Sequence, residues 1–142
     1  MLNKNLIDDG TIVITDCQTA GRGQMGTQWH TIPGANLTFS YVKVWEHLDV
    51  NEQFQISAAV ALALSEAINS QTGLKIDIKW PNDLYCYSKK LAGILIQNAV
   101  SASFIDYSVI GIGLNINQQH FEHLPNATSL AIECNQKFSK NE

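Results

Sequence analysis

The amino-acid sequence predicts an α+β domain in which a mostly antiparallel sheet is backed by helices. Much of the chain divides into short β-branched or alternating segments of strand length, and tight turns join consecutive segments. One segment, residues 49–73, instead has the apolar spacing of a long helix. The length of 142 residues and the hydrophobic content of 45% suit a single domain with a substantial core.

The N-terminal part of the chain predicts strand, glycine loop and strand in that order. A turn at Asp8-Asp9-Gly10 precedes the β-branched run Thr11–Thr15, which predicts a buried strand. The glycine-rich loop, residues 18–29, follows directly. After a turn at Pro33-Gly34, residues 36–44 alternate as a second strand.

The segment from Asp49 to Gly73 carries the strongest helix signal. Asp49 and Glu52 have the spacing of a capping box, and Gly73 suits the position that ends a helix. The sequence predicts a mostly buried helix packed on a sheet. The positions expected to share its buried face are Phe54, Ala58, Ala61, Leu62, Ser65 and Ile68.

The C-terminal half is predicted to add further strands. Residues 74–80 alternate cleanly, Pro81-Asn82-Asp83 ends that strand, and residues 88–90 form a turn between the next two. We expect these strands at residues 84–87, 91–100 and 107–117, a helix from Ser129, and the start of another helix over residues 137–142.

The composition excludes several classes of function. The net charge of −4 and the pI of about 5.5 argue against a nucleic-acid partner or a basic membrane surface. No apolar run approaches the roughly 20 residues of a membrane span, and residues 1–5 lack the apolar core of a signal peptide. Three cysteines without a CxxC pair indicate a reduced protein, and we expect a cytoplasmic location.

The glycine loop is the main candidate for ligand binding. Residues 21–26, Gly-Arg-Gly-Gln-Met-Gly, match the dinucleotide-binding pattern GxGxxG, but the segment that follows predicts a strand instead of the required helix. A glycine-rich hairpin is then about as probable as a ligand loop. Arg22 favours the ligand loop, because a guanidinium in a tight turn packs poorly but binds carboxylate or phosphate with two parallel donors.

Two other segments have both a structural and a functional interpretation. Asn82 and Asp83 either cap a strand end, which their spacing alone favours, or present polar groups to a nucleotide or metal. Lys89 and Lys90 form a pair that is usually solvated, but Lys90 precedes a buried strand and could contact a carboxylate or an α-phosphate.

The sequence offers no catalytic nucleophile. It contains no Ser-His-Asp or Cys-His arrangement, and His120 and His123 lie in a loop without further metal ligands nearby. Cations, glycines and amides suit a reaction in which the substrate attacks and the protein positions it and neutralises charge, such as phosphoryl or nucleotidyl transfer.

Taken together, these motifs resemble biotin protein ligases, that is, biotin–[acetyl-CoA-carboxylase] ligases. The matching segments occur in that family's order and are residues 18–26, Trp29, 34–37, 79–83, 90–95 and 111–117. The resemblance implies a catalytic domain with a class II aminoacyl-tRNA synthetase-like fold. It also implies ATP-dependent formation of biotinyl-5′-AMP with Mg²⁺, followed by transfer of biotin to a lysine of a biotin carboxyl carrier protein.

The resemblance also assigns roles to individual residues. Arg22 and Lys90 are the expected catalytic residues, and no resident metal is expected. The positions that match the family's biotin-binding residues are Gln18, Arg22, Gly23, Gln24 and Lys90. Those that match its nucleotide-binding residues are Trp29, Asn82, Asp83 and Asn115.

The sequence departs from the family's pattern in two ways. Gln24 stands where the family often has a second arginine. Residues 1–10 lack the Ser/Thr-Thr-Asn motif that precedes the loop in the family, so residues 1–142 are expected to be a partial catalytic core without a DNA-binding or C-terminal β domain. An exposed sheet edge is compatible with a homodimer.

Two alternative functions follow from the same motifs. The chain could be a weakly active or inactive module of this fold that binds a ligand or serves in assembly. It could instead be a lipoate or octanoate transferase, although the loop at residues 21–26 and Trp80-Pro81-Asn82-Asp83 fit biotin better.

Overall fold

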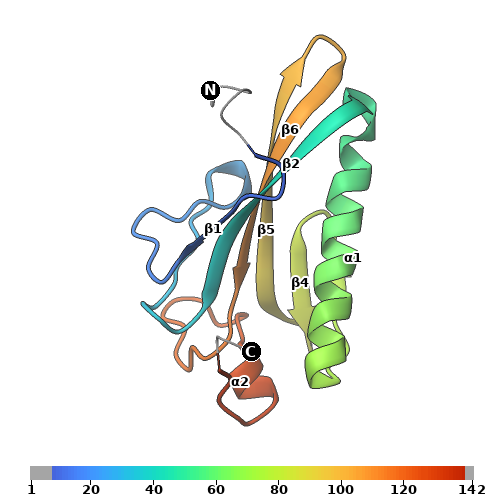
Figure 1. The fold of residues 1–142 in the computed structure, drawn as a ribbon. Coiled ribbons are helices and arrows are strands. Elements are labelled where there is room, and N and C mark those ends of the chain that lie inside the picture. Colours follow the sequence, from blue (N-terminus) through green and yellow to red (C-terminus); the bar gives the residue numbers. More distant parts are fainter. Residues whose placement is uncertain (1–7, 140–142) are drawn as a thin grey trace.

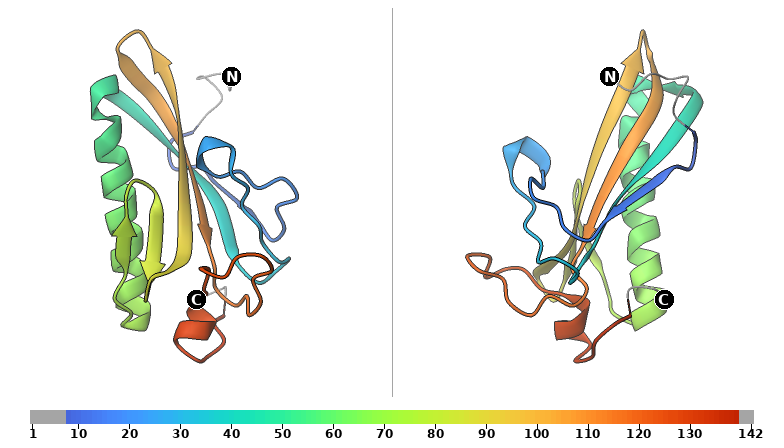
Figure 2. Two further views of the ribbon diagram at one scale, coloured as in Figure 1. Left: turned by 180° about the vertical axis from the view of Figure 1, so that it is seen from behind. Right: turned by 60° about the vertical axis from the view of Figure 1, so that its left-hand side comes forward.

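A six-stranded antiparallel sheet forms the centre of the computed structural model, which describes residues 8–139 (Figure 1). The strands lie in the order β1-β2-β6-β5-β4-β3. The long helix α1 covers one face of the sheet, and the glycine loop lies on the opposite face (Figure 2). The elements are β1 (Ile12–Thr15), β2 (Leu37–Asp49), α1 (Gln53–Thr72), β3 (Asp77–Lys79), β4 (Asp83–Cys86), β5 (Lys89–Ser101), β6 (Phe104–Leu114) and α2 (Leu130–Glu133).

The predicted long helix is confirmed, together with both of its ends. The Asp49 carboxylate accepts a hydrogen bond from the Asn51 amide at 2.8 Å, and the Glu52 carboxylate accepts one from the Asp49 amide at 3.1 Å. This capping box begins a short 3₁₀ turn that leads into α1. Gly73 ends the helix in the left-handed conformation, with φ of 71°.

The prediction that this helix is mostly buried is wrong. Ile56, Ala61 and Ile68 are buried against the sheet, whereas Phe54 and Leu62 are more than half exposed. The sheet covers only one side of α1, so this single contact cannot bury apolar residues spread around the helix.

The two faces of the sheet have different compositions because side chains alternate along each strand. In β6, Ile110, Ile112 and Leu114 belong to the core, which also includes residues of α1. The intervening Gly111 and Gly113 line a cavity under the glycine loop. A single strand therefore supplies both the core and the floor of this cavity.

The strand predicted at residues 11–15 is present as β1, but it is not buried. β1 lies at the edge of the sheet, where β2 is its one partner strand within residues 8–139. Ile12, Val13 and Ile14 are 55%, 61% and 65% exposed. The β-branched run correctly indicated a strand, but this composition does not specify whether the strand lies at the centre or the edge of a sheet.

The boundaries of the C-terminal elements also differ from the prediction. The turn consists of Tyr87 and Ser88, both with positive φ, so that Lys89 and Lys90 belong to β5. β3 is shorter than predicted, β6 begins and ends three residues earlier than predicted, and the helix expected from Ser129 is the single turn α2. Residues 137–139 are not helical, and the rest of the helix predicted there lies outside the described residues. Within residues 8–139, no helix combines the length and apolar character needed to cross a bilayer.

The free cysteines provide a test of the core. Cys17 is exposed and Cys86 is fully buried, and burial raises the pKa of the Cys86 thiol to about 11. We expect iodoacetamide at pH 8 to alkylate Cys17 in the native protein and Cys86 only after unfolding, since the thiolate is the reactive form. Peptide mass spectrometry with and without guanidinium would measure this difference. Equal native labelling of both thiols would contradict the buried position of Cys86.

The same pKa shift predicts a pH dependence of stability. The folded-state pKa of Cys86 lies above its ordinary value of 9.0, so folding favours the protonated thiol. Its contribution is complete below pH 9 and declines as the pH rises towards about 11. In alkaline denaturation, Cys86→Ala should lose less stability over this interval than the unmodified protein.

Candidate functional site

The glycine loop folds back on itself as a small hairpin over the sheet. The Trp29 amide donates to the Gly21 carbonyl at 3.0 Å, and the Gly23 amide donates to the Thr27 carbonyl at 2.7 Å. At the tip, Met25 and Gly26 both adopt positive φ, of 53° and 80°. The hairpin therefore has an ordered backbone of its own.

Two of the loop glycines are required by contacts within the hairpin. A Cβ at Gly21 would lie 2.3 Å from the Trp29 carbonyl oxygen, and a Cβ at Gly23 would lie 2.4 Å from Thr27 Oγ1. Neither position has room for a side chain unless the hairpin shifts. The two arms can therefore pair closely because these residues are glycines.

A buried amide network attaches the end of the loop to the sheet. The Asn36 side chain donates to Gln118 Oε1 at 2.6 Å and to Thr31 Oγ1 at 3.1 Å, and its oxygen accepts from the Ile116 amide at 3.1 Å. Asn36 and Gln118 are both buried. They join segments about eighty residues apart, so no local sequence pattern pointed to this network.

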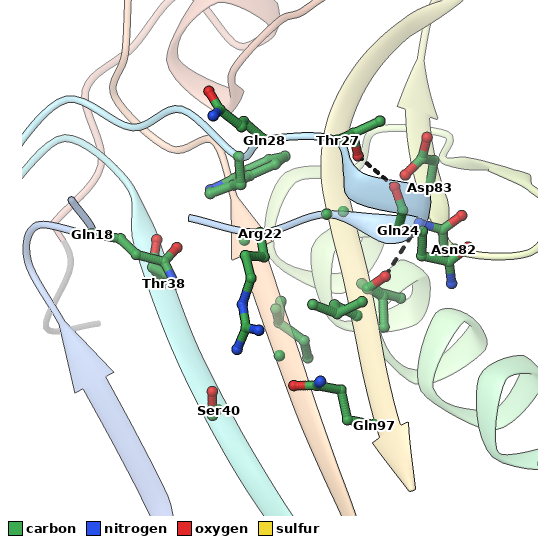
Figure 3. A pocket seen from close by; sticks show the side chains of 18 of the residues that line it. Gln18, Arg22, Gln24, Thr27, Gln28, Thr38, Ser40, Asn82, Asp83 and Gln97 are labelled. Atoms are coloured by element: carbon green, nitrogen blue, oxygen red, sulfur yellow. Dashed lines mark hydrogen bonds between the residues drawn. The ribbon is translucent and has the colours of Figure 1, made fainter. Parts of the chain in front are cut away.

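A cavity of about 410 Å³ lies between the hairpin and the face of the sheet opposite α1 (Figure 3). The sheet register builds its floor in rows, since Gly113 pairs with both Thr38 and Gly93. The next row consists of Ser40, Gly111 and Leu95. Glycines in the central strand lower the floor and leave room above it.

Arg22 places a positive charge in this cavity. Figure 3 shows its side chain extending from the hairpin over the sheet, towards the side where Ser40 and Gln97 lie. The side chain is exposed, and no carboxylate within residues 8–139 forms an ion pair with it. The guanidinium is therefore available to an anionic ligand.

Lys90 provides the second positive charge, from the start of β5. Its ammonium Nζ lies 2.7 Å from Asp83 Oδ1 and 5.8 Å from the centroid of the Trp29 ring. Asp83 Oδ1 is buried and has no other hydrogen-bond partner within the described residues. The ion pair links two predicted site residues and holds the lysine at the cavity wall.

The structure brings eight of the nine predicted site residues to this cavity. Its lining includes Gln18, Arg22, Gly23, Gln24, Trp29, Asn82, Asp83 and Lys90. The Asn82 side chain also donates to the Ile94 carbonyl at 3.2 Å, and its own carbonyl accepts from the Ile94 amide at 2.8 Å. These two bonds attach the turn before β4 to β5.

Asn115 is the predicted residue that the structure does not place in the cavity lining. It is buried, and its side chain donates to the Thr128 carbonyl at 2.9 Å. Its amide also donates to the Leu91 carbonyl at 3.0 Å. In this structure Asn115 therefore holds the segment before α2 against β5, and its contact with a nucleotide stays a prediction.

Sequence reasoning missed several polar residues of the floor. Thr38, Ser40 and Gln97 line the cavity from β2 and β5. Thr38 pairs with Gly113, Ser40 with Gly111 and Gln97 with Val109, and these relations require the strand register. Alternation alone indicated only that each strand has one polar face.

The lining defines the chemistry that the cavity can support. It contains two cations, one carboxylate, several amides and hydroxyls, and no cysteine or histidine. Within residues 8–139, no group of three His, Cys, Asp or Glu side chains is arranged to hold a metal ion. Such a cavity can hold an anionic organic molecule and neutralise charge that develops on it.

Comparisons with known proteins identify relatives across nearly the whole chain. Residues 1–115 match the model of the biotin/lipoate A/B protein ligase family. The bifunctional ligase/repressor BirA of Bacillus spizizenii is 33% identical over 144 residues, which is 98% of this chain and 44% of the relative. The biotin–[acetyl-CoA-carboxylase] ligase of Mycobacterium tuberculosis is 36% identical over 129 residues, which is 86% of this chain and 45% of that protein.

Solved structures show the same likeness. The biotin protein ligase from Aquifex aeolicus, in complex with biotin and ATP, superposes with a TM-score of 0.78 and 31% identity, over 95% of this chain and 56% of that chain. The ligase from Leishmania major with biotinyl-5-AMP gives a TM-score of 0.74 and 27% identity, over 89% and 55%. These matches confirm the predicted α+β, class II synthetase-like fold. The chain spans less than half the length of the two curated relatives.

Proposed function

The chain belongs to the biotin/lipoate A/B protein ligase family, and we propose that it provides the biotin-activating site of a biotin protein ligase. The observation that carries the proposal is the placement of Arg22 and Lys90 around one cavity whose lining contains no cysteine or histidine. This arrangement suits a reaction in which one substrate attacks another while the protein supplies positive charge.

In the first step, a carboxylate oxygen of biotin attacks the α-phosphorus of ATP. A new oxygen–phosphorus bond forms, the bond from the α-phosphorus to the bridging oxygen breaks, and pyrophosphate leaves with that electron pair. Negative charge increases on the α-phosphate oxygens, and the Lys90 ammonium and Arg22 guanidinium would stabilise it. Mg²⁺ would arrive bound to the ATP phosphates. Asp83 is the carboxylate of the cavity lining that would be available to coordinate it.

In the second step, the amine of a carrier-protein lysine attacks the acyl carbon of biotinyl-5′-AMP. An amide bond forms, AMP leaves, and the attacking nitrogen releases a proton. The name of the Mycobacterium tuberculosis relative supports a carrier domain of acetyl-CoA carboxylase as the acceptor. Before this transfer, the hairpin of residues 18–29 would shield the mixed anhydride from water.

The proposal predicts biotin-dependent exchange of label from pyrophosphate into ATP. The protein is incubated with biotin, ATP, Mg²⁺ and labelled pyrophosphate, and reactions without biotin or with lipoate in its place serve as controls. We expect label in ATP only with biotin, because reversal of the first step requires biotinyl-5′-AMP. A full-length ligase run in parallel validates the conditions.

The other outcomes distinguish the alternative functions. Exchange with lipoate alone would favour the alternative of a lipoate transferase, one that activates lipoate with ATP. If no exchange occurs where the full-length ligase is active, the catalytic proposal is wrong. Calorimetric titration with biotin would then show whether the chain is a binding module.

A further inference from the structure

The indole ring of Trp29 lies directly on the backbone of two paired strands. Gly93 of β5 and Gly113 of β6 face each other in the sheet register. A Cβ at Gly113 would lie 2.4 Å from Trp29 Cε2 and 2.6 Å from both Cζ2 and Nε1. A Cβ at Gly93 would lie 3.2 Å from Trp29 Cζ3. The ring can occupy this position only because residue 113 has no side chain. At residue 93, an added Cβ would also contact the ring closely.

Lys90 packs at the same place. Its Nζ lies 5.8 Å from the centroid of the Trp29 ring, within the range of a cation–π interaction. A Cβ at Gly93 would lie 3.6 Å from Lys90 Cε, in ordinary contact. The glycine pair, the indole and the lysine therefore form one packed unit at the wall of the cavity.

Neither the backbone conformation nor the strand packing explains the glycine at position 113. Its φ lies outside the positive range that favours glycine. Gly111 precedes it by two residues on the same face of β6, and a Cβ there would lie 3.4 Å from the Leu95 carbonyl oxygen and 3.8 Å from Leu95 Cβ. Within β6, the severe conflict is specific to Gly113, where the three nearest atoms all belong to the indole.

Packing contacts hold the Trp29 ring in place, without a hydrogen bond. Trp29 Nε1 is buried and has no hydrogen-bond partner within the described residues. An indole held in this way has no directional bond that would return it to its position after displacement. A single added methyl group beneath the ring should therefore change where the ring lies.

We propose that Gly93 and Gly113 form a seat that sets the position of the Trp29 indole and, through it, that of the Lys90 ammonium. The two glycines are positioning residues, and they act on the reaction only through Trp29 and Lys90. The consequence for catalysis rests on the proposed biotin-activating function, whereas the seat itself does not.

Fluorine NMR of protein labelled with 5-fluorotryptophan tests the seat directly. The three tryptophans give separate signals, and Trp29→Phe assigns that of Trp29. We expect Gly113→Ala to shift the Trp29 signal and leave those of Trp45 and Trp80 in place. Gly111→Ala, the matched control on the same strand face, should shift the Trp29 signal much less. An unchanged Trp29 signal in Gly113→Ala, or an equal shift in Gly111→Ala, would overturn the proposal.

Coupling between residues 29 and 113 supplies a second readout. Gly113→Ala should lower pyrophosphate exchange about tenfold, as expected for the loss of one positioned contact to the lysine. In a Trp29→Ala background, Gly113→Ala should change neither exchange nor melting temperature. The indole atoms with which the added methyl group would clash are absent in that background. If the double variant is further impaired or fails to fold, the strand itself requires glycine and the seat is wrong.

The two proposals can fail independently of each other. If the unmodified protein shows no exchange, the fluorine signals and the melting temperatures still decide whether the seat exists. If exchange occurs and the Trp29 signal is insensitive to Gly113→Ala, the seat fails and the proposed function stands.

Discussion

Replacing Lys90 with alanine is expected to reduce biotin-dependent pyrophosphate exchange by about 10³-fold or more. The substitution removes the ammonium that lies 2.7 Å from Asp83 and borders the cavity. It also leaves a carboxylate there without its cation, which would repel the triphosphate of ATP. Both effects oppose the transition state, whose negative charge the ammonium would otherwise offset.

The fold should persist in this variant, because Lys90 is partly exposed at the cavity wall and lies outside the hydrophobic core. Circular dichroism and thermal melting would verify this expectation. Lys89→Ala is the matched control, since Lys89 is an exposed neighbour in β5 that does not line the cavity. Retention of exchange in Lys90→Ala, or an equal loss in Lys89→Ala, would contradict the role assigned to Lys90.

Replacing Arg22 with alanine is expected to weaken binding of a non-hydrolysable biotinyl-adenylate analogue by about 10²-fold. The guanidinium extends over the floor of the cavity and has no carboxylate partner within the described residues. Its donors are therefore free to bind the ligand. Because the side chain is exposed, the melting temperature should change little. Isothermal titration calorimetry would measure the loss of affinity.

Two further variants separate geometry from charge at position 22. Arg22→Lys keeps the charge but loses the planar pair of donors, so we expect partial recovery of affinity. Lys43→Ala removes an equal charge from the surface of β2, where Lys43 pairs with Asp9 outside the cavity, and it should leave affinity unchanged. If Lys43→Ala weakens binding as much as Arg22→Ala, a general effect of net charge would explain both results.

Local patterns in the sequence were sufficient to predict the elements whose formation depends on nearby residues. The helix from Gln53 to Thr72 could be predicted because its capping box and its terminal glycine lie within its own segment. The exposure of β1 could not be predicted in this way, since it depends on which strands lie beside β1. In the same way, the exposed outer side of α1 depends on the absence of a second covering layer in the described part of the chain.

The site shows the same limit. Arg22 and Lys90 could be proposed from residue type and local context, and the structure places both at one cavity. The ion pair between Lys90 and Asp83 and the network of Asn36 and Gln118 required the pairing of distant segments. Asn115 also bonds to a distant segment, because its side-chain nitrogen donates to the Thr128 carbonyl. Its Oδ1 has no hydrogen-bond partner within the described residues, and its contact with a nucleotide stays a prediction.

The alternation along β6 has a consequence for how this protein tolerates mutation. Even-numbered residues from Ile110 to Leu114 belong to the core, while Gly111 and Gly113 line the cavity. A saturation scan of this strand should therefore separate into two interleaved profiles, one that follows cellular abundance and one that follows the proposed activity.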